Sequence, residues 1–129
     1  MKLEVEGKPE VQEPRESQVS KAIKSLKSYG PSSYASLTDA RGNYVQVAGG
    51  GVTCMVERYD AMSRKRLRAF HDEPSAVRPD GTILSFRAGN IPMRSDEWFM
   101  SNQVAEVFAA FLKGETFPGY VRWRDAPGF

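Results

Sequence analysis

Hydrophobic and polar residues alternate along much of the chain, and a period of two residues is typical of β-strands with one buried face. In residues 2–7 (KLEVEG), Leu3 and Val5 fall on one face while Glu4 and Glu6 fall on the other. The same alternation, or a dense run of β-branched residues, predicts strands in six further segments. They are residues 33–39, 43–49, 52–60, 64–72, 82–89 and 119–125.

Two other segments have the i, i+3, i+4, i+7 spacing of apolar residues that predicts amphipathic helices. The first is residues 16–30, where a glycine followed by a proline would end the helix. The second lies within residues 90–115, with Ser95 as its cap and Gly114 at its end. The apolar positions are Val19, Ala22, Ile23, Leu26 and Tyr29 in the first segment, and Trp98, Val104, Ala105, Phe108, Phe111 and Leu112 in the second.

The order of these elements predicts an α+β fold in a single domain that covers residues 1–129. The connections between the middle strands are short, so those strands are expected to be antiparallel. We therefore expect a single, mostly antiparallel β-sheet of about six to seven strands, with two amphipathic helices packed on it. Residues 1–16, which contain two prolines, are expected to form an edge strand and a linker.

Three consecutive glycines, Gly49 to Gly51, lie between two predicted strands in the segment VQVAGGGVTC. Glycine runs cradle phosphates in nucleotide-binding loops, but those loops precede a helix and carry a lysine or a third spaced glycine. Here Val52 and Thr53 start a strand, and Cys54 stands where the third glycine of a dinucleotide motif would be. The pattern favours a tight turn between neighbouring strands, in which glycine supplies the positive φ.

The chain contains one cysteine, Cys54, and one histidine, His71, and this scarcity limits the chemistry available to it. A structural zinc site needs about four such ligands, so no metal is expected, and no motif points to another cofactor. Cys54 lies in an apolar run, where a buried and unreactive thiol is the usual outcome. His71 beside Asp72 leaves open a small enzyme with a histidine base, but no nucleophile motif accompanies it. We therefore expect that the protein is not an enzyme.

The net charge of +2 is too small to indicate a nucleic-acid-binding protein by itself. Basic residues gather in residues 64–68 (RKRLR), which would suit a nucleic acid or an acidic protein surface. The segment also fits an edge strand kept from aggregating by its charges, with Arg66, Arg68 and Phe70 on one face. No segment approaches the ~18 apolar residues of a membrane span, and the N-terminus lacks the apolar core of a secretory signal. A cytoplasmic protein is therefore expected.

Four features follow one another along residues 17–125. They are the glycine turn after Gln46–Val47–Ala48, the Ile91–Pro92 pair ahead of the second helix, Phe108 and Phe111 followed by Gly114, and the closing Trp123. This succession resembles the small immunity proteins of bacterial polymorphic toxin systems, most nearly the first-numbered family of that series. The resemblance implies a protein that is encoded beside a toxin, binds the toxic domain, and protects the producing cell and its kin. It brings no catalytic residue with it.

The expected partner is therefore a cognate toxin domain, bound one-to-one and delivered by type VI secretion, Rhs-type or contact-dependent routes. The strand and loop from Glu57 to Glu73 form the predicted contact region, because charged groups steer association and set specificity. The predicted contact residues are Glu57, Asp60, Arg64, Arg66, Arg68, His71, Asp72 and Glu73. The main alternative is a small nucleic-acid-binding regulator that uses residues 64–68. Neither a membrane nor a nucleic acid is the partner that the sequence favours.

Overall fold

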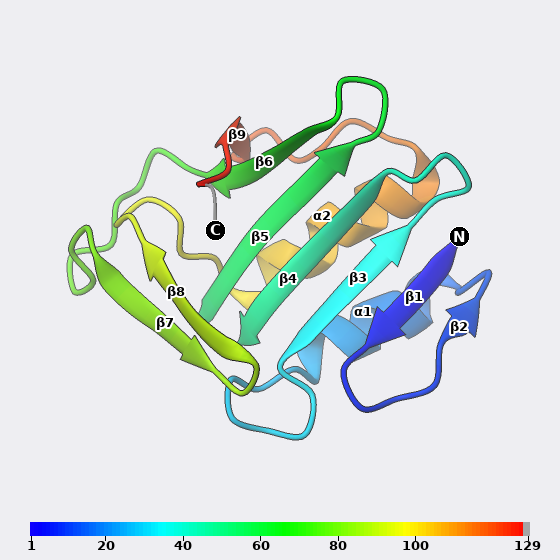
Figure 1. Ribbon diagram of the computed structural model, residues 1–129, viewed down its shortest axis with the longest axis horizontal. Helices are drawn as coiled ribbons and strands as arrows, with labels where there is room; N and C mark the ends of the chain where they lie inside the picture. Colours follow the sequence, from blue (N-terminus) through cyan, green and yellow to red (C-terminus); the bar gives the residue numbers. More distant parts are fainter. Residues whose placement is uncertain (128–129) are drawn as a thin grey trace.

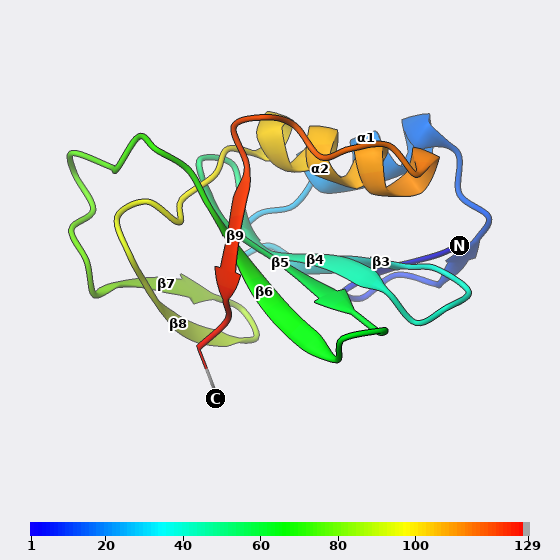
Figure 2. The same cartoon turned by 90° about the horizontal axis from the view of Figure 1, so that it is seen from above.

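The computed structural model describes residues 1–127, which form a seven-stranded antiparallel β-sheet, two α-helices and a separate two-stranded hairpin (Figure 1). The elements are β1 (Lys2–Val5), β2 (Val11–Gln12), α1 (Glu16–Lys24), β3 (Tyr34–Thr38), β4 (Tyr44–Gly50), β5 (Thr53–Asp60), β6 (Lys65–Phe70), β7 (Thr82–Phe86), β8 (Gly89–Met93), α2 (Ser101–Lys113) and β9 (Arg122–Asp125). The strand order in the large sheet is β2-β1-β3-β4-β5-β6-β9. Both helices lie on one face of this sheet, and the β7–β8 hairpin lies on the other side (Figure 2).

The α+β architecture with one main antiparallel sheet and two helices is confirmed. Strands β3 to β6 pair with their neighbours in sequence, because short turns connect them. In the β3–β4 turn, the Asp39 carboxylate accepts hydrogen bonds from the amides of Arg41 and Asn43. At the N-terminal side, β1 lies between β2 and β3, so the edge of the sheet is the two-residue strand β2.

The helix side of the sheet forms the main core, because alternate residues of each strand point toward the helices. Val45, Val47 and Val56 pack here with Val104 and Phe108 of α2, and each of these side chains is at most 1% exposed. The apolar stripe of α1 adds its buried positions to the same layer. Burial of one such side chain contributes about 1.5–3 kcal/mol, so this layer is a large source of stability.

The β7–β8 hairpin covers one end of the opposite face and leaves the rest of that face open (Figure 2). Its Leu84 and Ile91 pack against Met55 of β5, together with Trp98. The sequence predicts that residues 82–89 belong to the main sheet, and this prediction is wrong. The strand pairs with β8 instead, because the chain turns back at once and the hairpin satisfies its own backbone groups.

Both helices are shorter than their apolar patterns predict. The first ends at Lys24, and the second begins at Ser101 rather than near Ser95. Ahead of α2, Phe99 still forms an isolated β-bridge with Cys54, in which each amide donates to the other residue's carbonyl at 2.9 and 3.0 Å. The backbone is therefore extended almost up to the helix, and the apolar side chains just before residue 101 pack from a loop.

The glycine run forms the turn between β4 and β5, as the sequence predicts. Gly49 has φ +96° and Gly51 has φ +62°, both in the region that favours glycine. A Cβ atom on Gly50 would lie 2.3 Å from the Leu26 carbonyl oxygen, so the chain that follows α1 passes directly against this glycine. The Gly51 carbonyl accepts a 2.8 Å hydrogen bond from the amide of Ser101. The run therefore joins the sheet to the ends of both helices.

Candidate functional site

The eight residues predicted to contact a partner lie at three separate places. These are the β5–β6 turn with Asp60 and Arg64, the face of the sheet opposite the helices with Glu57, Arg66 and Arg68, and the chain after β6 with His71, Asp72 and Glu73. Strand β6 has six residues, so its first and last residues lie about 17 Å apart. The structure therefore does not gather the eight residues into one site.

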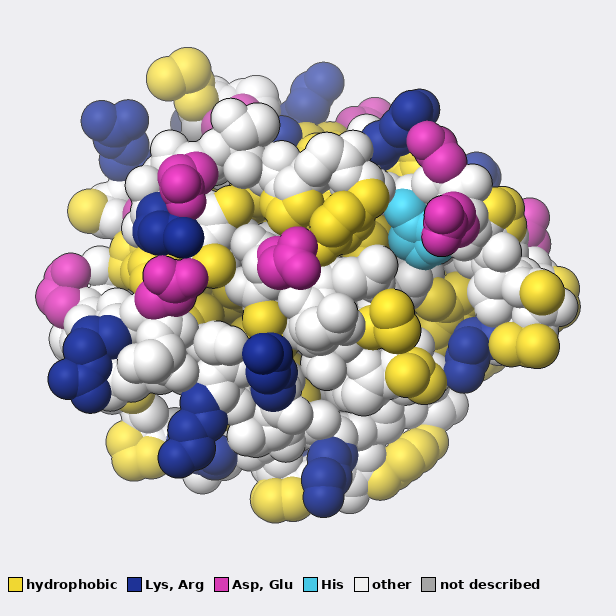
Figure 3. All heavy atoms as spheres, turned by 180° about the vertical axis from the view of Figure 1, so that it is seen from behind, with side chains coloured by type: hydrophobic (Ala, Val, Ile, Leu, Met, Phe, Trp, Pro, Cys, Tyr) yellow, Lys and Arg dark blue, Asp and Glu magenta, His cyan; other side chains and the backbone are white. Residues whose placement is uncertain are grey.

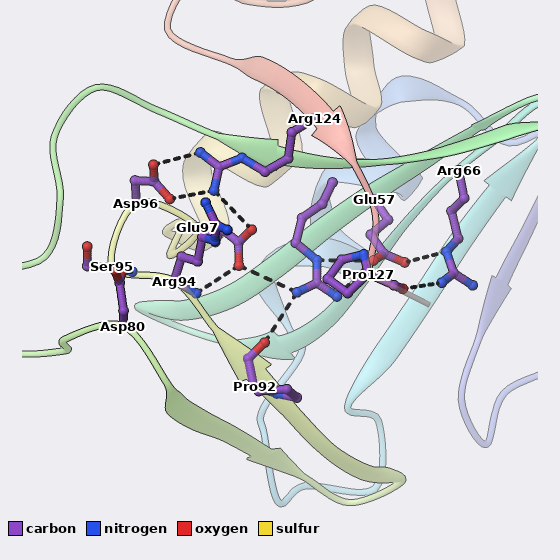
Figure 4. A network of polar contacts seen from close by, with 11 residues as sticks. Glu57, Arg66, Asp80, Pro92, Arg94, Ser95, Asp96, Glu97, Arg124 and Pro127 are labelled. Atoms are coloured by element: carbon purple, nitrogen blue, oxygen red, sulfur yellow. Dashed lines mark hydrogen bonds and ion pairs between the residues drawn. The ribbon is translucent and has the colours of Figure 1, made fainter. Parts of the chain in front are cut away.

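Glu57, Arg66 and Arg68 belong to an ionic network that is largely buried (Figure 4). Oε2 of Glu57 accepts hydrogen bonds from both Nε and Nη2 of Arg68, at 3.1 and 2.9 Å. The Nη1 group of Arg68 donates to the carbonyl of Pro92 at 3.3 Å and to Glu97 at 3.4 Å. Arg68, Glu57 and Glu97 are 0%, 1% and 2% exposed, so this guanidinium and its two carboxylates are withdrawn from water.

The network continues to β9 and to the segment before α2. The Arg124 guanidinium donates to both carboxylate oxygens of Asp96, at 2.7 and 3.1 Å, and lies 3.4 Å from Oε2 of Glu97. On the other side, Oε1 of Glu57 accepts a 2.9 Å hydrogen bond from Gln46. Buried charges are tolerated only when they are paired and hydrogen-bonded, and each carboxylate here meets that requirement. The network holds β5, β6, β9 and the segment before α2 together.

The basic segment 64–68 is therefore not an exposed edge strand. Strand β9 pairs with β6 on its outer side, and the guanidinium of Arg68 forms an ion pair with Glu57 inside the protein. Arg66 lies 3.6 Å from Glu57 and donates a 2.8 Å hydrogen bond to the carbonyl of Pro127. In this conformation Glu57 and Arg68 are not accessible to a partner.

His71 holds a loop through both of its ring nitrogens. Nε2 lies 2.7 Å from the carbonyl of Trp98, and Nδ1 accepts a 3.1 Å hydrogen bond from the amide of Glu73. The neutral tautomer with its proton on Nε2 satisfies both contacts. The ring also packs edge-on against Phe99. The other candidate nucleophile, Cys54, is buried, and burial raises the pKa of its thiol to about 12.

A hollow of about 630 Å³ opens beside His71, and we call it the His71 pocket. Three apolar side chains around it come from distant segments and remain exposed: Val52 at 59%, Met100 at 45% and Tyr120 at 37%. Figure 3 shows the single histidine, in cyan, beside acidic and apolar side chains on this face of the molecule. The lining residues are Val52, His71, Asp72, Glu73, Ser75, Arg78, Trp98, Met100, Gln103 and Tyr120.

Two carboxylates, Asp72 and Glu73, line the His71 pocket, and a third, Glu106, lies next to it as the partner of Tyr120. Asp72 pairs with Arg122 at 2.9 Å on the surface. Glu106 accepts a 2.9 Å hydrogen bond from the hydroxyl of Tyr120, and burial together with this bond raises the pKa of Tyr120 well above its usual range. Within the part of the chain that the structure describes, the carboxylate of Glu73 has neither a hydrogen bond nor an ion pair. Glu73 is therefore the carboxylate at this rim that is open to a new partner.

Among residues 1–127, no group of three or more His, Cys, Asp or Glu side chains is arranged to hold a metal ion. The same residues include no helix with the length and apolar character that a membrane crossing demands. No family model, curated protein or solved structure matches the chain. Evidence for function therefore comes from the surface chemistry of this chain.

Sequence reasoning found part of the His71 pocket and missed the rest. The cluster of His71, Asp72 and Glu73 is visible in the sequence, because the three residues are consecutive. Met100 and Tyr120 carry no local signal of this kind. Their positions follow from the start of α2 and from the pairing of β9 with β6, which are tertiary features.

Proposed function

We propose that this protein is a cytoplasmic immunity protein that binds a cognate bacterial toxin domain one-to-one and neutralises it. The toxin would be a secreted effector of interbacterial competition, and binding would cover its active site or an exosite. The observation that carries the proposal is the His71 pocket, where apolar side chains from three distant segments stay exposed inside a charged rim. The resemblance of residues 17–125 to polymorphic-toxin immunity proteins supports the same assignment.

The His71 pocket has the composition of a protein–protein contact. Such interfaces have an apolar centre, enriched in aromatic residues and methionine, surrounded by a polar rim. Tyr120 and Met100 are residues of these types, and they lie at one hollow with Val52. Single exposed apolar residues are common and need no explanation, whereas these three come together at one hollow beside charged residues. Inhibition by stoichiometric binding requires such a surface and no catalytic group.

The state of the candidate catalytic groups favours binding over catalysis. A general base needs a free nitrogen within reach of a substrate proton, and both ring nitrogens of His71 contact backbone groups of this protein. A cysteine nucleophile acts as its thiolate, and the buried Cys54 has a raised pKa. If His71→Ala keeps the biological effect, an enzyme that uses a histidine base is ruled out.

The nucleic-acid-binding alternative depends on residues 64–68, and the structure weakens its premise. Arg68 is buried in an ion pair, and Arg66 contacts a carboxylate and a carbonyl of the same chain. Nucleic-acid binding by phosphate contacts falls steeply with salt. Gel shifts at low salt with single-stranded and double-stranded probes test the alternative directly. A shift that salt abolishes would favour a regulator over an immunity protein.

The direct test of toxin binding uses the product of the adjacent gene. Expression of that product alone is expected to arrest growth, and co-expression with this protein is expected to restore it. Co-purification followed by light scattering is expected to give a one-to-one complex. If the adjacent product forms no complex with this protein and its toxicity is not relieved, the proposed function is wrong.

A further inference from the structure

We infer that the His71 pocket receives an arginine or lysine side chain from the toxin, with the carboxylate of Glu73 as its counter-ion. This inference rests on the proposed function and extends it by naming the chemistry of the partner's surface. The contact region of the toxin would be basic, and Asp72, which lines the same pocket, would lie next to the contact. A chain with a net charge of +2 would thus bind through a local acidic rim.

Glu73 is an open charged acceptor at the pocket, and the two neighbouring cations each have a contact within the chain. Arg122 already pairs with Asp72 at 2.9 Å, and the guanidinium of Arg78 lies over the Trp98 ring, 5.2 Å from its centre. Both oxygens of Glu73 are open within the described chain. An interface that excludes water must supply a donor to such a carboxylate, and a cation is the strongest donor available. An acidic partner would instead place two like charges together.

The apolar walls of the pocket suit the stem of a long cationic side chain. Arginine and lysine bury their methylene groups along apolar surface while their charged heads reach a polar partner. Val52 and Met100 provide such surface, and the ring of Tyr120 adds a face for a cation. The hollow of about 630 Å³ has room for a side chain of this length. A purely apolar partner side chain would fill the walls but leave Glu73 unpaired.

The backbone that carries Glu73 is already held in place before a partner binds. The amide of His71 donates to the carbonyl of Asp96 at 3.0 Å, and the amide of Glu73 donates to the ring of His71 at 3.1 Å. Two residues further, the amide of Ser75 donates to the carbonyl of Ser95 at 2.8 Å. A loop fixed in this way loses little conformational freedom on binding, which favours affinity.

The hollow that includes Glu57, the buried carboxylate of the ionic network, lacks this open acceptor. It measures about 320 Å³, lies beneath the β7–β8 hairpin and includes Glu57 in its lining. The carboxylate of Glu57 is already saturated by Arg68 and Gln46. A partner there would have to compete with internal hydrogen bonds, whereas a partner at Glu73 would not.

The test measures affinity for the purified product of the adjacent gene, inactivated in its active site, by calorimetry at several salt concentrations. Glu73→Gln keeps the shape of the side chain and removes its charge, and a loss of about tenfold in affinity is expected. Val52→Lys places a cation at the pocket mouth, and a loss of about tenfold or more is expected. Glu4→Gln, an exposed acid on β1, is the matched control and is expected to bind as the wild type does.

The outcomes separate this inference from the proposed function. Wild-type binding that weakens with salt, together with a smaller salt dependence for Glu73→Gln, supports the basic side chain in the pocket. Wild-type binding with unchanged affinity in Glu73→Gln and Val52→Lys overturns the inference and leaves the immunity function standing. Tighter binding by both variants also overturns it, since it would show an acidic partner. A wild type that does not bind the adjacent product overturns both proposals. Each variant is checked for folding by its melting curve.

Discussion

Residues 57–73 contain two groups of charged side chains, one buried in the protein and the other exposed on its surface. Glu57 and Arg68 turn into the protein, where each is at most 1% exposed and each binds the other. Asp72 and Glu73, at the end of the same stretch, are exposed at the rim of the His71 pocket. A cluster of charge in the sequence therefore does not distinguish charges that hold the fold from charges that are free to meet a partner.

The two groups differ in how many of their hydrogen-bonding and ion-pairing groups already have partners within the fold. A buried carboxylate or guanidinium must be paired within the fold, because transfer of a lone charge out of water costs several kcal/mol. An exposed carboxylate keeps its water and needs no partner until another molecule displaces that water. Mutation should therefore affect stability at the interior group and binding at the surface group.

Arg68→Met is expected to have the largest effect on stability. The variant keeps an apolar stem but leaves Glu57 and Glu97 buried without their shared cation. Removal of one partner of a buried ion pair costs about 3–5 kcal/mol. Urea denaturation measures the loss, with Arg64→Met at the exposed turn as a control of equal charge. The double variant Arg68→Met with Glu57→Gln is expected to recover part of the loss. If Arg68→Met unfolds at the same urea concentration as the wild type, the network does not stabilise the fold.

Two neighbouring glycines of the glycine run also differ in this way, because Gly50 packs against the chain after α1 and Gly51 has open space around it. In Gly50→Ala the new methyl group would lie 2.3 Å from the carbonyl oxygen of Leu26, so the backbone after α1 must move. Such overpacking costs about 1–3 kcal/mol. In Gly51→Ala no atom lies near the new methyl group, and the cost is the positive φ alone, about 1 kcal/mol. Thermal melts of the pair rank the two effects, and equal losses would contradict the close approach at Gly50.

Glu6 is a surface carboxylate that is held by local hydrogen bonds and so lies between the two extremes. Its Oε1 accepts bonds from the hydroxyl and the amide of Ser33, both at 2.7 Å, and these bonds hold the pKa of Glu6 below its ordinary value of 4.5. Because the folded-state pKa is lowered, the stabilisation is present above about pH 4.5 and is lost as the pH falls through the lowered value. Glu6→Gln should therefore flatten the fall in stability with acid. Urea midpoints at neutral and acid pH check this, and parallel curves for variant and wild type would contradict it.

Glu73→Gln is expected to have the smallest effect on stability. The carboxylate of Glu73 has no partner within the described chain, so its removal should change the free energy of unfolding by less than about 0.5 kcal/mol. Urea denaturation of this variant and of Arg68→Met compares directly the stability lost at an exposed charge with that lost at a buried one. A loss above about 1 kcal/mol in Glu73→Gln would show that this side chain supports the fold, which would end its assignment to a partner.

The sequence predicts local features well because they depend on local chemistry. Alternation in residues 64–72 places Arg66, Arg68 and Phe70 on one face, and the ladder between β5 and β6 agrees. Glycine at the β4–β5 turn follows from its freedom to adopt positive φ. Predictions fail where distant segments compete for the same residues. The start of α2 is delayed because Phe99 pairs with Cys54, and no local pattern signals that pairing.

The candidate site shows the same limit more clearly. The sequence identifies His71, Asp72 and Glu73 as a charged group, but it also proposes Glu57 and Arg68, which are buried. Burial depends on which strands neighbour β5 and β6 and on the position of the loop before α2. These are contacts between residues far apart in the chain, and a period of two residues describes only which face a side chain occupies.

Short-range periodicity and backbone freedom are enough to predict the class of fold, the faces of the strands, the two helical segments and the glycine turn. Contacts between distant segments are needed to specify the separate β7–β8 hairpin, the burial of Arg68 and the assembly of the His71 pocket. The pocket draws Val52, Glu73, Met100 and Tyr120 from four segments that meet at one end of the molecule. The physical reason is that pairing of charges and exposure of apolar side chains are properties of neighbours in space, which the order of residues along the chain does not specify.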